Sequence, residues 1–211
     1  MIIINTKAYR KGVGEKVEKL VENCIEVADP KKLIFSVQPE DLLRLEDSEV
    51  EVFAQHIDGV EPGSHTGSIL GEGVKEAGAT GTLINHSENR LEKEKIKASV
   101  DKAKELGLTT VVCAQSPEEC AELSEFEPDY IAFEPPELIG GDISVAEAEP
   151  EIIEEAVEAA APVTALTGAG IKTSEDVSKS IELGCEGVLV ASGVVKAENP
   201  GEAAKELVSG L

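Results

Sequence analysis

The chain has 211 residues, of which 41% are hydrophobic and 29% charged, a composition that supports a substantial core under a solvated surface. Its 42 aspartates and glutamates exceed its 19 lysines and arginines, so the formal net charge is −23 at pH 7. Because phosphate backbones and anionic lipids repel such a polyanion, the charge disfavours nucleic acid and membrane surfaces as partners.

Three further classes of protein are disfavoured by the order of the residues. No apolar stretch approaches the roughly 18 residues of a membrane span, and residues 1–5 lack the features of a signal peptide. Cys24, Cys113, Cys120 and Cys185 are widely separated, which favours reduced core thiols over a disulfide framework or a zinc site. We therefore expect a cytoplasmic protein, and the evenly spread acidity is typical of a salt-adapted, acidic proteome.

Eight short, mostly apolar runs alternate along the chain with longer amphipathic segments. Near-continuous apolar runs are typical of parallel strands that are buried on both faces. The expected strands are residues 2–4, 33–37, 50–54, 81–84, 109–113, 130–133, 163–166 and 187–190. The expected helices are residues 14–28, 39–45, 67–77, 90–106, 117–124, 150–160, 174–183 and 200–209.

Glycine and proline support these helix boundaries. A glycine follows three of the amphipathic segments, where a left-handed residue ends a helix, and a proline begins three others, where its missing N–H costs nothing. The glycines are Gly78, Gly107 and Gly184, and the prolines are Pro117, Pro150 and Pro200.

Each strand and its following helix occupy about 26 residues, and right-handed crossovers allow either an open doubly wound sheet or a closed (β/α)8 barrel. Eight regular repeats favour the barrel. No low-complexity linker interrupts the repeats, so we expect residues 1–211 to form one domain.

Polar residues follow several of the expected strands, at the face where barrels form their active sites. Asn5 and Lys7 end the first strand. Lys7 is either a solvated loop residue or a cation that anchors an anionic substrate and polarises its oxygens, and Asn5 could donate a hydrogen bond to the same oxygen.

The fourth strand runs into Asn85-His86-Ser87-Glu88. His86 is either a structural histidine or a neutral imidazole that shuttles protons between adjacent oxygens, and Glu88 could orient Lys7 by pairing with it. His56 and His65 raise the question of a metal. Two histidines nine residues apart without clustered carboxylates are a poor ligand set, so we expect no metal site.

Glu134 ends the otherwise apolar sixth strand. A buried charge costs several kcal/mol unless it is paired or used, so Glu134 is either half of a buried ion pair or a base whose affinity for protons is raised by desolvation. The stiff Pro135-Pro136 and the loose Gly140-Gly141 suggest that a lid lies between them.

Gly168-Ala169-Gly170 only partly matches a dinucleotide-binding motif, because position 173 is threonine and no acidic ribose-binding residue follows at the expected distance. Together with Ala191-Ser192-Gly193 after the eighth strand, it fits better as a phosphate site built from backbone N–H groups.

These segments together resemble the triosephosphate isomerase family, in its short archaeal form, from the first strand to the last. The resemblance rests on Asn5-Thr-Lys7, Ala54-Gln-His-Ile-Asp58, Gly63-Ser-His-Thr-Gly67, Asn85-His-Ser-Glu88, Glu134-Pro-Pro-Glu-Leu-Ile-Gly140, Gly168-Ala-Gly-Ile171 and Val190-Ala-Ser-Gly-Val194. It implies a TIM barrel that interconverts dihydroxyacetone phosphate and D-glyceraldehyde 3-phosphate through an enediolate, in glycolysis and gluconeogenesis, without a cofactor. It also implies a homotetramer or a dimer.

The resemblance further implies a role for each site residue. Glu134 would be the base, His86 the electrophile and Lys7 the electrostatic anchor, a division of labour that is known for the family. The residues that would contact the substrate, its phosphate or the lid are Asn5, Ile139, Gly170, Ala191 and Ser192.

The lid departs from the family pattern Ile-Gly-Thr-Gly, because this chain has Ile139-Gly140-Gly141-Asp142. A hydroxyl is lost and a carboxylate is placed near the expected phosphate, or else Asp142 faces solvent and precedes the next turn. Two other functions remain open. One is a different sugar-phosphate enzyme on the same barrel, such as a lyase or an epimerase, and the other is a binding protein that has lost turnover.

Overall fold

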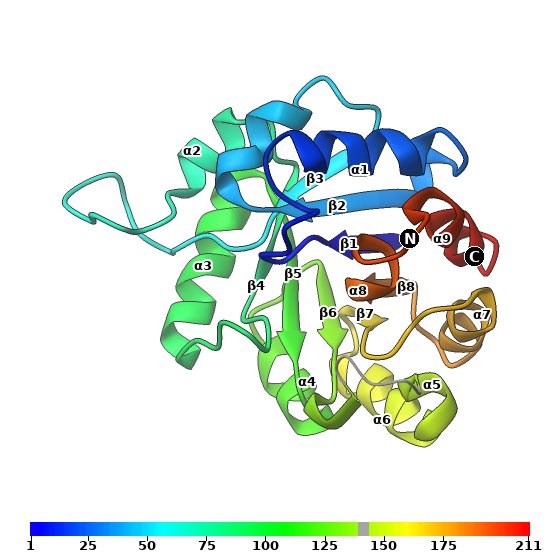
Figure 1. The fold of residues 1–211 in the computed structure, drawn as a ribbon. Coiled ribbons are helices and arrows are strands. Elements are labelled where there is room, and N and C mark those ends of the chain that lie inside the picture. The colour runs from blue at the N-terminus through cyan, green and yellow to red at the C-terminus, as the bar shows by residue number, and fades with distance from the viewer. Residues whose placement is uncertain (139–143) are drawn as a thin grey trace.

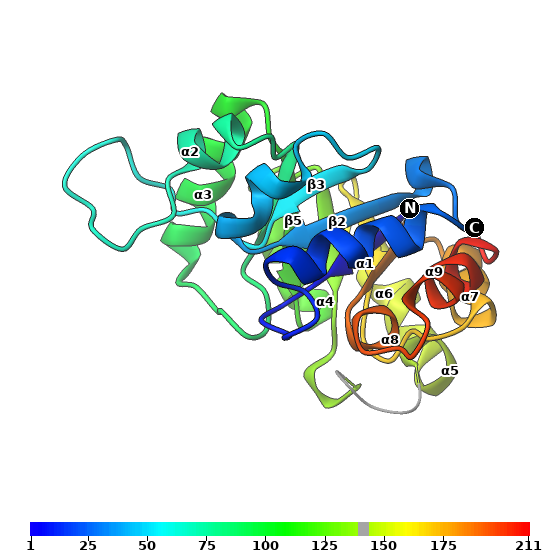
Figure 2. The same ribbon diagram turned by 45° about the horizontal axis from the view of Figure 1, so that its top comes forward.

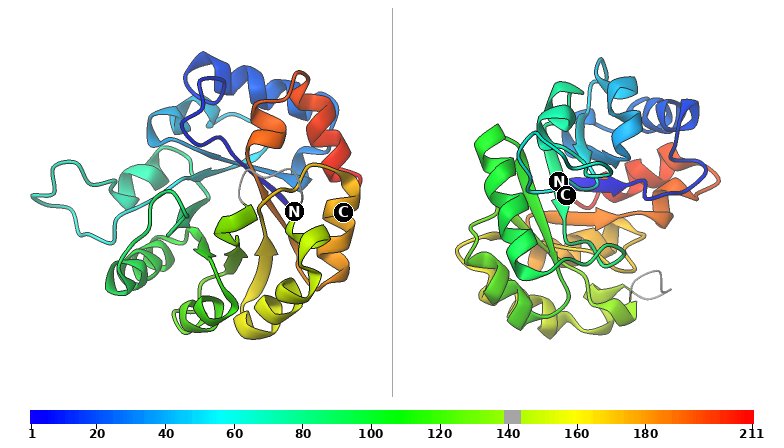
Figure 3. Two further views of the ribbon diagram at one scale, coloured as in Figure 1. Left: turned by 60° about the horizontal axis from the view of Figure 1, so that its bottom comes forward. Right: turned by 90° about the vertical axis from the view of Figure 1, so that its left-hand side faces the viewer.

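The computed structural model describes residues 1–138 and 144–211, and its eight parallel strands close into a barrel. Each strand pairs with the next along the sequence, and β8 pairs with β1. The helices surround this ring of strands (Figures 1 and 3). The strands are β1 (Ile2–Asn5), β2 (Leu33–Val37), β3 (Glu51–Ala54), β4 (Gly81–Ile84), β5 (Thr109–Ala114), β6 (Tyr130–Phe133), β7 (Thr164–Thr167) and β8 (Gly187–Val190). The predicted (β/α)8 barrel is confirmed.

Helices and short 3₁₀ turns connect the strands on the outside of the barrel. The α-helices are α1 (Glu15–Ile25), α2 (Gly71–Glu76), α3 (Lys93–Leu106), α4 (Pro117–Ser124), α5 (Val145–Ala148), α6 (Pro150–Ala160), α7 (Ser174–Glu182), α8 (Ser192–Val195) and α9 (Pro200–Val208). The 3₁₀ helices are η1 (Pro30–Lys32), η2 (Pro39–Leu45) and η3 (Pro136–Leu138). Over the described residues, none of these helices is both long and apolar enough to cross a bilayer.

All eight strands were predicted to within one residue at each end. The strands β2, β4, β6 and β8 have the predicted bounds. β1 continues one residue further than predicted, because Asn5 pairs with Ser36 of β2. The strand pattern was readable because the runs are buried on both faces and therefore almost purely apolar.

The helix predicted over residues 67–77 was wrong at its start, because α2 begins only at Gly71. Asp58 explains the difference: its Oδ2 accepts the N–H of Ile69 at 2.7 Å, and a parallel bridge joins Asp58 to Leu70. These bonds hold Ile69 and Leu70, just before α2, outside a helix. The loop between β3 and α2 extends away from the barrel (Figures 1 and 2).

Two other predicted helices were too long by more than one residue, and two short helices, α5 and α8, were missed. α1 ends before residue 28, since the Asp29 carboxylate accepts the N–H of Lys31 and starts η1. α3 begins after residue 90, since Oδ1 of Asn85 accepts the N–H of Leu91 at 3.0 Å. The short helix α8 lies where the sequence predicted only a phosphate-binding loop.

The predicted helix ends are confirmed in their backbone geometry. Left-handed φ values of 91°, 69° and 100° occur at Gly78, Gly107 and Gly184, which follow α2, α3 and α7. Prolines occupy first-turn positions at the starts of α4, α6 and α9. The sequence therefore reports correctly where these helices stop and start.

The core has two shells, as expected for a barrel. Inward-facing side chains fill the barrel itself, and larger clusters pack the outer faces of the strands against the helices. The inner cluster contains Ile3, Ile34, Phe53, Leu83, Val111, Cys113, Ala132, Leu166 and Leu189. The four cysteines are buried and unpaired, in agreement with the prediction of reduced core thiols.

Candidate active site

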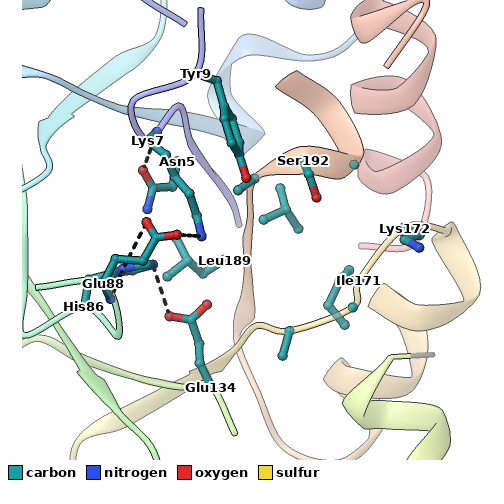
Figure 4. A pocket seen from close by; sticks show the side chains of 15 residues that line it. Asn5, Lys7, Tyr9, His86, Glu88, Glu134, Ile171, Lys172, Leu189 and Ser192 are labelled. Carbon is teal, nitrogen blue, oxygen red and sulfur yellow. Dashed lines mark hydrogen bonds and ion pairs between the residues drawn. The ribbon is translucent and has the colours of Figure 1, made fainter. Parts of the chain in front are cut away.

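A pocket of about 210 Å³ opens at the carboxyl ends of the strands. It is lined by residues that follow five different strands, so no single segment of the chain forms it (Figure 4). The lining residues come from the ends of β1, β4, β6, β7 and β8 and include Asn5, Lys7, His86, Glu134, Gly170, Ala191 and Ser192. The structure thus brings together every predicted site residue that it describes. Ile139, like Gly140, Gly141 and Asp142, lies outside the described residues.

Lys7 is held both through its backbone and through its side chain. Its φ of 49° is left-handed, a strained conformation for a residue with a side chain, and such strain concentrates at functional sites. Its N–H donates to Oδ1 of Asn5 at 2.9 Å, and its Nζ donates to Oε1 of Glu88 at 2.9 Å. The Lys7 side chain is only 11% exposed, so it is not the solvated loop lysine that the sequence left open.

Two glutamine amides hold the carbonyl group of Lys7. Gln55 donates from Nε2 to the carbonyl oxygen of Lys7 at 3.0 Å, and Gln38 donates to it at 3.4 Å. The sequence showed Gln55 at a strand end but offered no reason to link it with Lys7. Its partner is a backbone atom from another strand, and only the closed barrel brings the two together.

His86 is buried and is held as a neutral ring. Its Nδ1 accepts the N–H of Glu88 at 3.1 Å, so the proton of the neutral imidazole is on Nε2. Burial, reinforced by the nearby charge of Lys7, lowers the pKa of His86 from 6.5 to about 4. At neutral pH the ring can therefore donate one hydrogen bond from Nε2 without carrying a charge.

Glu134 is 6% exposed, and its carboxylate lies opposite the ring of His86. Oε2 of Glu134 is 3.6 Å from Nε2 of His86 and has no hydrogen-bond partner among the described residues. Burial raises the pKa of Glu134 from 4.5 to about 7, against the opposing effects of Lys7 and of a hydrogen bond from the Cys113 thiol. In the described part of the chain, no lysine or arginine forms an ion pair with Glu134. This geometry favours a base over half of a structural ion pair.

Gly168 makes room for this carboxylate. A Cβ atom at position 168 would lie 2.7 Å from Oε1 of Glu134, so a side chain there would displace the carboxyl group. The sequence suggested that this glycine belongs to a phosphate-binding loop. The structure shows that it also permits the approach of β7 to the buried glutamate.

The far side of the pocket presents backbone donors. Ala169 and Gly170 have consecutive left-handed φ values of 71° and 75°, and α8 begins at Ser192 with Ala191 as its N-cap. The first N–H groups of a helix have no acceptor inside the helix. Such N–H groups, together with a left-handed loop, favour the binding of an anion.

The two histidines outside the pocket lie in different surroundings. Nε2 of His56 lies 3.3 Å from Oδ1 of Asp58, and His65 is exposed on the loop before α2. Among the residues described, no three histidine, cysteine or acidic side chains cluster in a way that could hold a metal ion.

Tyr9 and Lys172 also line the pocket, and the sequence analysis did not single them out. Tyr9 gave one available signal, because it is one of two tyrosines in the chain and stands two residues after Lys7. Lys172 follows the glycine-containing loop at Gly170 and gave no comparable signal.

Comparisons with known proteins agree with this geometry. The family model described as triosephosphate isomerase matches residues 1–208. A protein named triosephosphate isomerase from Methanobacterium bryantii is 46% identical over 99% of this chain and 96% of its own length. Proteins of the same name from Methanosarcina acetivorans and Methanocaldococcus jannaschii are 43% and 44% identical, over 98% and 99% of this chain and 96% and 98% of their own lengths.

Proposed function

Since this chain belongs to the triosephosphate isomerase family, we propose that Glu134, His86 and Lys7 perform its reaction. The enzyme interconverts dihydroxyacetone phosphate and D-glyceraldehyde 3-phosphate, a step of glycolysis. We propose that it also works in the reverse direction, in gluconeogenesis. The substrate carries a carbonyl beside a hydroxyl-bearing carbon. The reaction therefore needs a base that removes a proton from carbon and a group that donates a proton to the carbonyl oxygen.

Glu134 removes a proton from the carbon beside the carbonyl group. The electron pair of that C–H bond moves to form an enediolate, and the negative charge develops on the carbonyl oxygen. His86 donates the proton of Nε2 to this oxygen and recovers one from the neighbouring hydroxyl. Glu134 then returns its proton to the other carbon, so the enzyme ends unchanged.

The pKa values match these tasks. A base works best when its pKa is near the working pH, and burial raises the pKa of Glu134 to about 7. A neutral imidazole can both give and take a proton, and burial keeps His86 neutral with a pKa of about 4. The Lys7 ammonium stabilises the negative oxygen of the enediolate in a site where little water screens the charge.

The phosphate group binds at the opposite side of the pocket. Gly170, Ala191 and Ser192 present backbone N–H groups there, and the family resemblance adds Asn5 as a substrate contact and Ile139 as part of the lid. The positive end of α8 favours the dianion. Binding the phosphate away from the reacting carbons leaves Glu134 and His86 free for proton transfer.

One observation supports this proposal most strongly: Nε2 of His86 lies 3.6 Å from Oε2 of Glu134, in the pocket that Lys7 also lines. A coupled assay with D-glyceraldehyde 3-phosphate tests it. Formation of dihydroxyacetone phosphate by the wild-type protein, and its loss in Glu134→Gln, would support the proposal. Turnover that survives Glu134→Gln would contradict it.

The same assay tests the two other functions. A Schiff-base lyase needs a lysine inside the barrel, and the strands β5, β6, β7 and β8 contain none. With a lyase or an epimerase, no dihydroxyacetone phosphate would form from D-glyceraldehyde 3-phosphate. A binding protein would bind the substrate without turnover.

We also propose that the protein is cytoplasmic and forms a homotetramer or a dimer. The support for the assembly is the resemblance of its motifs to the short archaeal members of the family. Light scattering on the purified protein at 0.1 M and 1 M potassium chloride tests the assembly. A monomer at both salt concentrations would contradict it.

A further inference from the structure

Two segments that bind opposite ends of the substrate are joined directly by two lysines. The loop of residues 6–12 carries Lys7, and α8 begins at the phosphate side of the pocket. Nζ of Lys196, at the end of α8, lies 4.2 Å from the centroid of the Tyr9 ring. Nζ of Lys11 donates to the carbonyl oxygen of Ala197 at 2.8 Å. The loop and the helix are thus linked from both sides.

The loop itself is closed and compact. The N–H of Tyr9 donates to the carbonyl oxygen of Thr6 at 3.3 Å, and the N–H of Gly12 donates to that of Tyr9 at 2.8 Å. A Cβ atom on Gly12 would lie 2.7 Å from Cβ of Thr6, so the two ends of the loop are in close contact. A contact made by Tyr9 therefore constrains the position of Lys7 two residues earlier.

The helix α8 is a single turn that joins the Tyr9 contact to the phosphate side of the pocket. The N–H of Lys196 donates to the carbonyl oxygen of Ser192 at 3.1 Å, which places one helical turn between the Tyr9 contact and the expected phosphate contact. The Tyr9 ring also lines the substrate pocket, and in Figure 4 it points into the pocket between Lys7 and Ser192. The ring therefore contacts both the Lys196 ammonium, which lies over its face, and the space where the substrate lies.

We propose that Tyr9 and Lys196 are positioning residues that set the distance between the Lys7 ammonium and the phosphate-binding end of α8. The proposal rests on the proposed function, in which these two groups bind opposite ends of one substrate. A ligand that spans both groups binds more tightly when their separation is fixed, because binding then loses little conformational entropy in ordering the two groups. A ligand that contacts only the phosphate site gains nothing from it.

Calorimetric titration with two probes tests this difference. 2-Phosphoglycolate carries a carboxylate for Lys7 and a phosphate for α8, and inorganic phosphate reaches only the phosphate site. The readout is the ratio of the two Kd values, which cancels any general loss of folded protein. Tyr9→Leu should weaken 2-phosphoglycolate relative to phosphate by about tenfold, since a misplacement of about 1 Å can cost up to 100-fold. Lys196→Met should change the ratio by about fivefold, as expected for an exposed cation–π contact.

Three variants serve as controls for these changes. Lys196→Arg keeps a cation over the ring and should keep the wild-type ratio. Lys205→Met removes an exposed lysine from α9 and should also keep it, which separates the contact from the net charge. Lys7→Ala should shift the ratio, because it removes the group that binds the carboxylate.

The outcomes distinguish the proposal from the proposed function. If Lys7→Ala shifts the ratio and both Tyr9→Leu and Lys196→Met leave it unchanged, the positioning role is wrong and the role of Lys7 stands. If Lys7→Ala also leaves the ratio unchanged, Lys7 does not bind the end opposite the phosphate, and both proposals fail. A shifted ratio in Tyr9→Leu and Lys196→Met, with the wild-type ratio in Lys196→Arg, supports the positioning role.

Discussion

Nε2 of His86 lies 3.6 Å from Oε2 of Glu134, and burial shifts the pKa values of the two groups in opposite directions. The pKa of His86 falls to about 4, while that of Glu134 rises to about 7. Burial disfavours the charged form of each group, so the histidine loses its proton more easily and the carboxyl group keeps its proton to higher pH. The pair therefore combines a neutral donor with a base that titrates near neutral pH.

The first prediction concerns the pH dependence of kcat/KM. Glu134 must be ionised to act as a base, so kcat/KM should rise with pH and level off above about 7. His86 should add no change above pH 5, because its pKa is about 4. The measurement is kcat/KM between pH 5 and 9.

The substrate phosphate also titrates, with a second pKa of about 6, and needs a control. Its contribution is the same in every variant, whereas Glu134→Asp should move the part of the profile that belongs to the carboxyl group. If the pH profiles of kcat/KM for the wild type and Glu134→Asp have the same shape, the whole pH dependence belongs to the substrate phosphate.

The second prediction concerns the tautomer of His86. Nδ1 accepts the N–H of Glu88, so nitrogen NMR should show a neutral ring protonated at Nε2 from pH 5.5 to 8.5. His56 and His65 provide internal references in the same spectrum. A His86 signal that titrates near pH 6.5 would show that the ring is not held neutral.

The third prediction concerns stability. The carboxyl pKa of Glu134 is higher in the folded protein than its ordinary value of 4.5, so the folded state binds more protons between pH 4.5 and about 7. The free energy of unfolding therefore decreases as pH rises through this interval, by about 3 kcal/mol from this group. Glu134→Gln removes that loss and should stabilise the protein at pH 8.

Urea unfolding of wild type and Glu134→Gln at pH 4.5 and pH 8 measures this effect. The difference between the two proteins should be about 3 kcal/mol larger at pH 8 than at pH 4.5. The lowered pKa of His86 gives the opposite trend, but its causes are burial, Lys7 and Glu88, all of which Glu134→Gln leaves in place, so we expect this trend to cancel. A difference that is the same at both pH values would show that the buried carboxylate is not destabilising.

The fourth prediction follows from the net charge of −23. Screening shortens the Debye length from about 10 Å at 0.1 M salt to about 3 Å at 1 M, so repulsion between carboxylates should weaken. Exposed pairs such as Lys97–Asp101 weaken too, but each contributes little. We expect Tm to rise with potassium chloride, and a flat or falling Tm would contradict the salt-adapted interpretation.

A sucrose series checks the cause of that change. Sucrose stabilises proteins by exclusion from their surface and does not screen charge. If sucrose and potassium chloride raised Tm equally at matched osmolality, screening would not explain the salt effect.

The sequence predicted the barrel well because its strands are apolar on both faces and its helices end at glycines and begin at prolines. It also placed Lys7, His86 and Glu134 at strand ends, where the closed barrel brings them to one pocket. The start of α2 was not predictable from local pattern, because the side chain of Asp58 competes for the N–H of a residue eleven positions away.

The parts of the site that escaped prediction depend on contacts between distant segments. Gln55 contacts a backbone carbonyl 48 positions away, and Lys196 contacts a ring near the opposite end of the chain. Neither contact has a characteristic spacing in the sequence. The tautomer of His86 likewise depends on one backbone N–H and was readable only from the structure.

The most direct test of the central claim, that Glu134 is the base, is the kcat of Glu134→Asp. This change retracts the carboxylate by one methylene and should lower kcat by on the order of 100-fold, while KM changes by less than about threefold. Glu155→Asp, on the exposed face of α6, controls for the same chemical change away from the pocket. A kcat of Glu134→Asp that remains near the wild-type value would remove Glu134 from the proton transfer and contradict the account.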